Sequence, residues 1–128
     1  MKNYGNFATA VATYNHLEVF RTLIEKESRV LVLEQALQAS AQRGYASIVK
    51  VILDKIASEP NRMTLRHQKA FSLAAYYGRT EVLRLMFPMS IDQLQLDEAL
   101  YQATDNEHEE TVKLLLEFGA DPNVEGPE

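Results

Sequence analysis

The fold is decided by a block that recurs four times, and its third copy reads AAYYGRTEVLRLMF at residues 74–87. The other copies read VATYNHLEVFRTLIE at residues 11–25, SAQRGYASIVKVILD at residues 40–54 and ATDNEHEETVKLLLE at residues 103–117. Each copy has the pattern of a helix end, a tight turn and a second, amphipathic helix. Internal repetition with a period of about 20–50 residues is typical of stacked helical units. The sequence therefore predicts an all-α solenoid of about four helical pairs, with little or no β-hairpin.

Apolar spacing and turn residues place the helices along the chain. Because Val30-Leu31-Val32-Leu33 continues into strong helix formers, we predict helix rather than strand there. Ser90-Ile91-Asp92-Gln93 predicts a capping box that opens the fourth pair, and Pro60-Asn61 marks a loop. The expected first helices are residues 6–14, 31–43, 65–77 and 92–105, and the expected second helices are residues 16–26, 45–57, 80–87 and 109–118.

The second helices carry apolar residues at i, i+1, i+4 and i+5, which is the pattern of a helix packed against a neighbour. The first helices carry a small residue near the end, where paired helices approach closely. The apolar sets are Val19, Phe20, Leu23 and Ile24; Ile48, Val49, Ile52 and Leu53; Val82, Leu83, Met86 and Phe87; and Thr111, Val112, Leu115 and Leu116. The small residues are Ala12, Ala41 and Ala75, with Thr104 as a poorer fourth member.

One residue between the two helices of each pair is expected to have a positive φ. Gly44 and Gly78 occupy this position in the second and third copies, where glycine adopts such a backbone without a steric penalty. Asn15 tolerates the same conformation in the first copy. Glu107 occupies it in the fourth copy, where a left-handed backbone costs roughly 1 kcal/mol.

The composition indicates one soluble domain over residues 1–128. Apolar residues make up 46% of the chain and there is no cysteine, which excludes disulfides and thiolate metal sites. No apolar run approaches the ~18 residues that cross a bilayer, and the N-terminus lacks the pattern of a signal peptide. We therefore expect a cytoplasmic protein without membrane contacts.

Charge is distributed unevenly along the chain, whose net charge is −5. Residues 92–128 hold eleven acidic residues and one Lys, whereas residues 1–91 hold twelve basic and seven acidic residues. In a linear stack, sequence order becomes spatial order, so one end carries a negative field. Such a field influences association rate and partner choice, although a solvated face that aids solubility explains the same pattern.

Three stretches resemble the ankyrin repeat family. Residues 73–83 resemble the core of a repeat, residues 112–123 (VKLLLEFGADPN) resemble its ending, and His16-Leu17-Glu18-Val19 resembles the start of its second helix. The resemblance covers nearly all of the chain and implies repeats at about 1–29, 30–60, 61–91 and 92–123. The family's usual Thr-Pro-Leu-His opening is missing from every repeat, and its Gly-Ala-Asp ending is present only from Gly119.

Repeat lengths also depart from the family pattern. The equivalent residues Glu18, Ser47, Glu81 and Glu110 are 29, 34 and 29 positions apart, against a family repeat of about 33. The resemblance therefore implies that the β-hairpin fingers are reduced to tight loops in the two short repeats. Arrays of this kind resemble those of secreted effectors of intracellular bacteria and of large viruses, which would place the protein in a host cytoplasm.

The sequence contains no recognisable catalytic or metal-binding constellation. Residues 108–112 begin like a zinc-peptidase helix, but Val112 stands where the second His is required. Glu109 and Glu110 point to different helix faces, and no serine has the flanking glycines of a nucleophile elbow. We therefore predict no enzyme activity, cofactor, metal or small-molecule substrate. The resemblance implies that His16 and His108 are structural histidines of the turn.

The candidate binding surface is the concave side of the stack. In ankyrin-like proteins the ends of the first helices and the adjoining loops face this side, and tyrosine and arginine are enriched at interface hot spots. Aromatic rings also cover the edges of cores, which is the competing interpretation. We predict that this surface binds a partner protein. The candidate residues are Tyr14, Gln42, Arg43, Tyr45, Tyr76, Tyr77, Arg79, Asp105 and Asn106.

Two other functions remain open. The ending at residues 119–123 usually leads into another repeat, and residues 114–116 lack a polar outer cap, so the chain could be a targeting or regulatory segment of a larger, effector-type enzyme. A nucleic-acid-binding helical repeat is less favoured. Residues 43–84 hold eight basic and three acidic residues with interleaved tyrosines, but the acidic end of the chain would repel phosphate.

Overall fold

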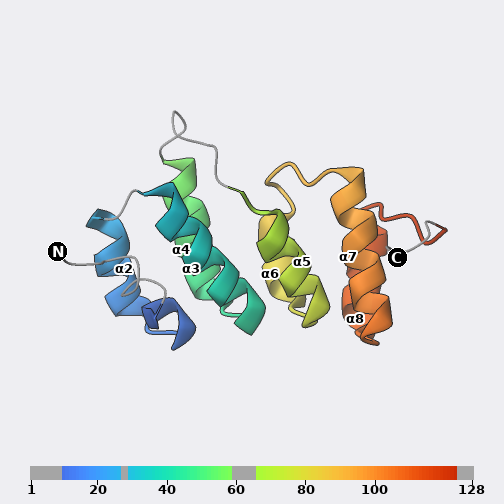
Figure 1. Cartoon of the computed structure of the whole chain (residues 1–128), viewed down its shortest axis with the longest axis horizontal. Helices are drawn as coiled ribbons and strands as arrows, with labels where there is room; N and C mark the ends of the chain where they lie inside the picture. Colours follow the sequence, from blue (N-terminus) through green and yellow to red (C-terminus); the bar gives the residue numbers. More distant parts are fainter. Residues whose placement is uncertain (1–9, 27–28, 59–65, 124–128) are drawn as a thin grey trace.

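The computed structural model describes residues 10–26, 29–58 and 66–123, and these residues form helices and turns without a strand. Residues 10–13 are helical and precede α2. Figure 1 shows the helical pairs laid side by side in chain order, which confirms the predicted all-α solenoid. The helices are α2 (Leu17–Lys26), α3 (Val30–Arg43), α4 (Ala46–Ala57), α5 (Gln68–Tyr76), α6 (Thr80–Met86), α7 (Gln93–Asp105) and α8 (Glu109–Glu117).

The helices form two layers. The first helices α3, α5 and α7 contact one another in that order, and the second helices α2, α4, α6 and α8 do the same. Each first helix also packs against the second helix of its own pair, such as α3 against α4. The place of a residue in the sequence therefore sets its place along the stack.

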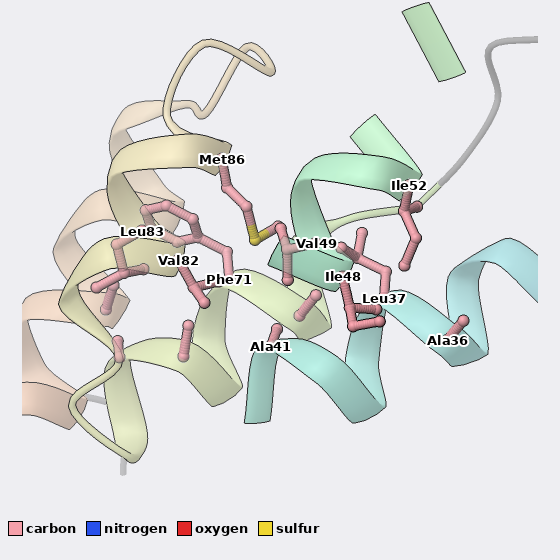
Figure 2. Packing of buried hydrophobic residues seen from close by; sticks show 14 of the residues in the cluster. Ala36, Leu37, Ala41, Ile48, Val49, Ile52, Phe71, Val82, Leu83 and Met86 are labelled. Atoms are coloured by element: carbon pink, nitrogen blue, oxygen red, sulfur yellow. The ribbon is translucent and has the colours of Figure 1, made fainter. Parts of the chain in front are cut away.

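The core lies between the two layers and between neighbouring pairs. Ile48, Val49 and Ile52 of α4 are fully buried, and Figure 2 shows Met86 of α6 directed toward Val49. Phe71 of α5 is buried in the same cluster. Burying one side chain of this size contributes about 1.5–3 kcal/mol, so the contacts between pairs are the main source of stability.

Residues at the two ends of the stack depart from the expected burial. Val19 of α2 and Leu116 of α8 have exposed fractions of 54% and 41%, although both occupy positions expected to pack. Thr104 is exposed, whereas the equivalent Ala41 and Ala75 are fully buried. The apolar period identifies the packing positions, but a position is buried only where a neighbouring pair covers it.

The connection between α6 and α7 is short. Residues 87–92 contain turns and no strand, as expected where the repeat is short. The rings of Phe87 and Phe118 stack with centroids 3.9 Å apart and join the ends of α6 and α8. The predicted start of the first helix at residue 6 and the predicted loop at Pro60-Asn61 lie outside the described residues.

The predicted capping box at residues 90–93 is wrong, because the N-cap of α7 lies two residues later. Asp92 is the N-cap, and its Oδ1 accepts a hydrogen bond from the backbone N–H of Gln95 at 2.8 Å. The Oε1 atom of Gln95 accepts the N–H of Asp92 at 3.0 Å. Ser90 has a φ of 63° and so lacks the extended backbone that an N-cap requires.

The turn inside each pair is closed by a residue of positive φ, as predicted. The N–H of the next residue bonds to the carbonyl five positions back, as Tyr45 does to Ser40 at 2.9 Å. This is the Schellman arrangement, which ends the first helix and turns the chain back on itself. The four residues and their φ angles are Asn15 at 57°, Gly44 at 77°, Gly78 at 70° and Glu107 at 58°.

Replacing Glu107 with glycine should stabilise the protein. The left-handed backbone costs a non-glycine residue about 1–2 kcal/mol, and glycine avoids this cost. Glycine also has more freedom in the unfolded state, which lowers the gain in stability by about 0.5–1 kcal/mol. We expect a net gain of roughly 0.5–1 kcal/mol, measured as a rise in Tm. The matched control Asn15→Gly should gain less, because asparagine tolerates this backbone. A Tm for Glu107→Gly at or below that of the parent protein would contradict the strain argument.

Candidate protein-binding surface

A groove of about 810 Å³ lies on the layer of first helices. Its walls are formed by helix α3, helix α5 and the helical residues 10–13 that precede α2. Most of the lining residues belong to α3. Gln42 and Arg43, two of the residues expected from the sequence, are part of it. The lining residues are Ala10, Gln35, Gln38, Ala39, Gln42, Arg43, Lys69 and Leu73.

One face of α3 presents three glutamines to this groove. Gln35, Gln38 and Gln42 are spaced i, i+3 and i+7, which places them on one side of a helix. The buried residues Leu37 and Ala41 occupy the other side of α3, which faces the core. Burial of one face of α3 therefore fixes the direction of the opposite, glutamine-bearing face.

The groove carries positive charge and unused hydrogen-bonding capacity. Among the described residues, Arg43 and Lys69 are the charged residues of its lining, and no acid lines it. Within the described part of the chain, neither they nor the three groove glutamines form a side-chain hydrogen bond or ion pair. By contrast, Lys50 on α4 pairs with Asp54 at 3.4 Å. The groove side chains are therefore available to a partner.

Two tyrosines lie at the end of α5. Tyr76 and Tyr77 have exposed fractions of 44% and 41%, and their rings meet edge to face with centroids 4.9 Å apart. They are the equivalents of Gln42 and Arg43, 34 residues later in the sequence. Tyr14, the equivalent residue of the first repeat, is 70% exposed. Exposed aromatic rings thus continue the line of the groove residues at the ends of the first helices.

The other four candidate residues differ in exposure and in their contacts. Tyr45 is half-buried against the core. Asn106 donates from Nδ2 to the carbonyl of Gln102 at 2.8 Å and so closes the end of α7. Asp105 is exposed. Arg79 is half-buried, and its Nε donates to a backbone carbonyl in the preceding repeat, as described next.

Arg79 and His108 make the same contact in successive repeats. The Nε atom of Arg79 donates to the carbonyl of Gln42 at 2.9 Å, and Nε2 of His108 donates to the carbonyl of Tyr76 at 2.8 Å. Each side chain crosses the glycine of the preceding turn. A Cβ on Gly78 would lie 2.7 Å from Nδ1 of His108. These glycines therefore serve both the backbone turn and the contact between repeats, and His108 has the structural role expected of it.

Six residues of the groove lining were not among the residues predicted from the sequence, namely Ala10, Gln35, Gln38, Ala39, Lys69 and Leu73. Gln35 and Gln38 lie two turns and one turn before Gln42 on the same face of α3. Lys69 and Leu73 are the equivalents, 34 residues later, of Gln35 and Ala39. Extending the repeat alignment toward the start of each first helix would have identified them, because the signal lies in the alignment rather than in residue type.

Other classes of site find no support in the described residues. No group of three or more histidine, aspartate or glutamate side chains is placed there to hold a metal ion. None of the described helices is both long enough and apolar enough to span a bilayer.

Replacing Gly78 with alanine should destabilise the protein more than the same change at Gly119. Both glycines have a positive φ, at 70° and 105°, so both variants pay about 1–2 kcal/mol of strain. Only at Gly78 does the new Cβ meet another side chain, because nothing lies within 4 Å at Gly119. Displacing His108 also removes its hydrogen bond, which adds about 1 kcal/mol. Equal losses in urea unfolding would show that the contact between repeats contributes nothing.

A solved structure has a fold similar to the helical solenoid described above. A chain in the crystal structure of the yeast ribosomal protein Rps3 in complex with its chaperone Yar1 is similar in fold, with a TM-score of 0.74 at 17% identity. The match covers 97% of this chain and 95% of that chain. At such low identity the likeness shows the fold alone.

Curated relatives are closer in sequence. Ankyrin repeat and SOCS box protein 2 of Rattus norvegicus is 31% identical over 114 residues, which cover 84% of this chain. The Bos taurus protein of the same name is 31% identical over 126 residues, which cover 94% of this chain. In both cases the chain spans 18% of the length of the relative. A family model of ankyrin repeats (3 copies) matches residues 36–126, well over half of the sequence. This chain therefore belongs to the ankyrin repeat family.

Proposed function

We propose that this chain is a protein-interaction module and that its partner binds the groove on the layer of first helices. The observation that carries the proposal is the set of unpaired polar side chains on α3 and α5. Gln38, Gln42, Arg43 and Lys69 line one groove, and their side chains form no hydrogen bond or ion pair within the described chain. They are therefore solvated in the free chain, and a partner can replace that water with its own polar and charged groups.

The packing of α3 and α5 supports a preformed surface. Leu37 and Ala41 of α3 and Phe71, Ala74 and Ala75 of α5 are buried beneath the groove. The backbone that carries the groove side chains is therefore held in place before binding. Because this surface is already ordered, this chain loses little conformational entropy when a partner binds, which favours specific binding.

Tyr76 and Tyr77 extend the proposed surface toward the third repeat. Tyrosine combines a large apolar area with a polar hydroxyl and loses little conformational entropy, so it is frequent among interface hot spots. Both rings are more than one-third exposed while resting on each other. We assign Arg79 a structural role, because its Nε already binds the carbonyl of Gln42.

A photo-cross-linking amino acid at Gln38 or Tyr76 should capture the partner. The full chain would carry the probe at one position at a time in lysate of the source cell, with captured proteins identified by mass spectrometry. The matched control is a probe at Lys50, which is exposed on α4 in the other layer. We expect one protein to be captured from both groove positions and not from Lys50. Capture of the same protein mainly from Lys50 would refute binding in the groove.

A second candidate function is that of a targeting or regulatory segment within a larger, possibly enzymatic or effector-type protein. The favouring observation is the last face of the stack, where Tyr101 and Leu116 are 39% and 41% exposed. These residues, with Val112 and Thr104, border a pocket of about 230 Å³. Such a face fits one further repeat, because stacked repeats bury apolar residues against the next unit.

Amide hydrogen exchange tests this second candidate on residues 1–128 expressed alone. If a further repeat normally covers the last face, amides of α8 should exchange faster than those of α4, and the protein should self-associate as its concentration rises. The physical reason is that no described helix follows α8 to cover this face. A monomer in which the α8 amides exchange as slowly as the α4 amides would count against a missing neighbour.

A further inference from the structure

The two cations of the groove stand at its opposite ends. Arg43 is the last residue of α3, and Lys69 lies in the first turn of α5. Figure 1 shows α3 and α5 side by side and running in the same direction. Because Lys69 is the equivalent of Gln35, 34 residues later in the sequence, it belongs to the Gln35 end of the groove. Gln35 and Arg43 are eight residues apart, which is about 12 Å along a helix that rises 1.5 Å per residue. The groove therefore presents two positive charges on neighbouring helices, about 12 Å apart along the helix axis.

The positive charge of the groove gives way to negative charge in the fourth repeat. In the fourth repeat, Glu98 takes the place of Lys69 and Asp105 takes the place of Tyr76. Both acids are exposed on α7. A ligand with negative charge is therefore attracted to the groove and repelled by the next repeat, which fixes where along the stack it binds.

Between the two cations, the glutamines match the repeat of an extended peptide. Gln38 and Gln42 are four residues apart on α3, or about 6 Å along its axis. Two residues of an extended chain cover about 6.6–7.2 Å, and alternate residues face the same side. A glutamine amide has both donors and an acceptor, so it can bind the N–H and the C=O of a main chain. The glutamines thus suit a peptide backbone that runs along α3.

We propose that the groove binds an extended acidic peptide segment of a partner protein, in which two carboxylates about four residues apart pair with Lys69 and Arg43. This inference rests on the proposed function and specifies the chemistry of the partner. Four extended residues span about 13–14 Å. This span is close to the separation of the two cations along α3, and the flexible side chains of lysine and arginine can bridge the difference. An even separation also puts both carboxylates on the side of the peptide that faces the groove.

A peptide fits these residues better than a nucleic acid strand. A single strand is usually held by a row of cations along its backbone together with aromatic platforms for its bases. Among the described residues, the groove lining instead has three amides and two cations, and the exposed tyrosines Tyr76 and Tyr77 lie beyond it at the end of α5. The acids of the neighbouring α7 would further weaken binding of a long polyanion. A single-stranded oligonucleotide nevertheless serves as the competing ligand in the test.

The test is a selection of random peptides of about twelve residues, displayed on phage, against the immobilised full chain. We expect the selected pool to be enriched in pairs of Asp or Glu about four residues apart, as the groove geometry requires. The variant Arg43→Gln with Lys69→Gln should lose this enrichment, and each single change should weaken a selected peptide about tenfold, or about 1.4 kcal/mol. The control Lys50→Gln, outside the groove, should select the same pool as the parent.

Charge reversal separates a specific loss from a folding defect. A variant with Arg43→Glu and Lys69→Glu should select peptides with pairs of Lys or Arg, a change that an unfolded protein cannot produce. A parent pool without acidic pairs would overturn the inference, as would an unchanged acidic pool on the double-glutamine variant. So would displacement of every selected peptide by an oligo-dT strand that binds more tightly through Arg43 and Lys69. If these results occur while cross-linking from Gln38 still captures a partner, the acidic-peptide inference fails and the proposed function stands.

Discussion

Each helical pair depends on one residue of positive φ between its two helices. That residue allows the N–H of its successor to reach a carbonyl five positions back, so the first helix ends and the second packs against it. At Gly44 and Gly78 the missing side chain also leaves space for Arg79 and His108 of the following repeat. The same small residue therefore controls the angle within a pair and the contact between pairs.

The groove follows from this stacking. When one side of α3 and of α5 is buried against the second helices, the opposite side must face outward, and the repeats bring these outward sides next to each other. None of the groove glutamines or cations contributes to the core. The backbone that carries them is nevertheless held in place by the alanines and large apolar residues of the core.

Charge adds a direction to this surface. The groove of the second and third repeats holds Arg43 and Lys69, which form no ion pair with the described residues. By contrast, α7 and α8 carry acids at Asp97, Glu98, Asp105, Glu109 and Glu110. An approaching protein meets a field that changes sign along the stack, which restricts its orientation before contact. This polarity is already visible in the sequence, because a solenoid converts sequence order into spatial order.

Sequence patterns predicted the helices and turns closely, because these depend on interactions within a few residues. Helix α3 begins at Val30 despite an apolar run that also suits a strand, and the turn residues have the expected backbone. The cap at Asp92 was missed because serine and aspartate are both good N-caps, and only the backbone shows which one is extended. The exposure of Val19 and Leu116 was missed because burial depends on neighbours outside the local pattern.

By itself, the sequence determined the repeat, the approximate positions of the described helices, the left-handed turns and the change of charge along the chain. The reason is that helical period, turn chemistry and composition are properties of short segments. Only the tertiary structure decided that Gln35, Gln38 and Lys69 share one groove, and that the nitrogen of Arg79 is bound to the carbonyl of Gln42. Those facts depend on the distance and rotation between neighbouring pairs, which the packing of buried side chains sets and no single segment encodes.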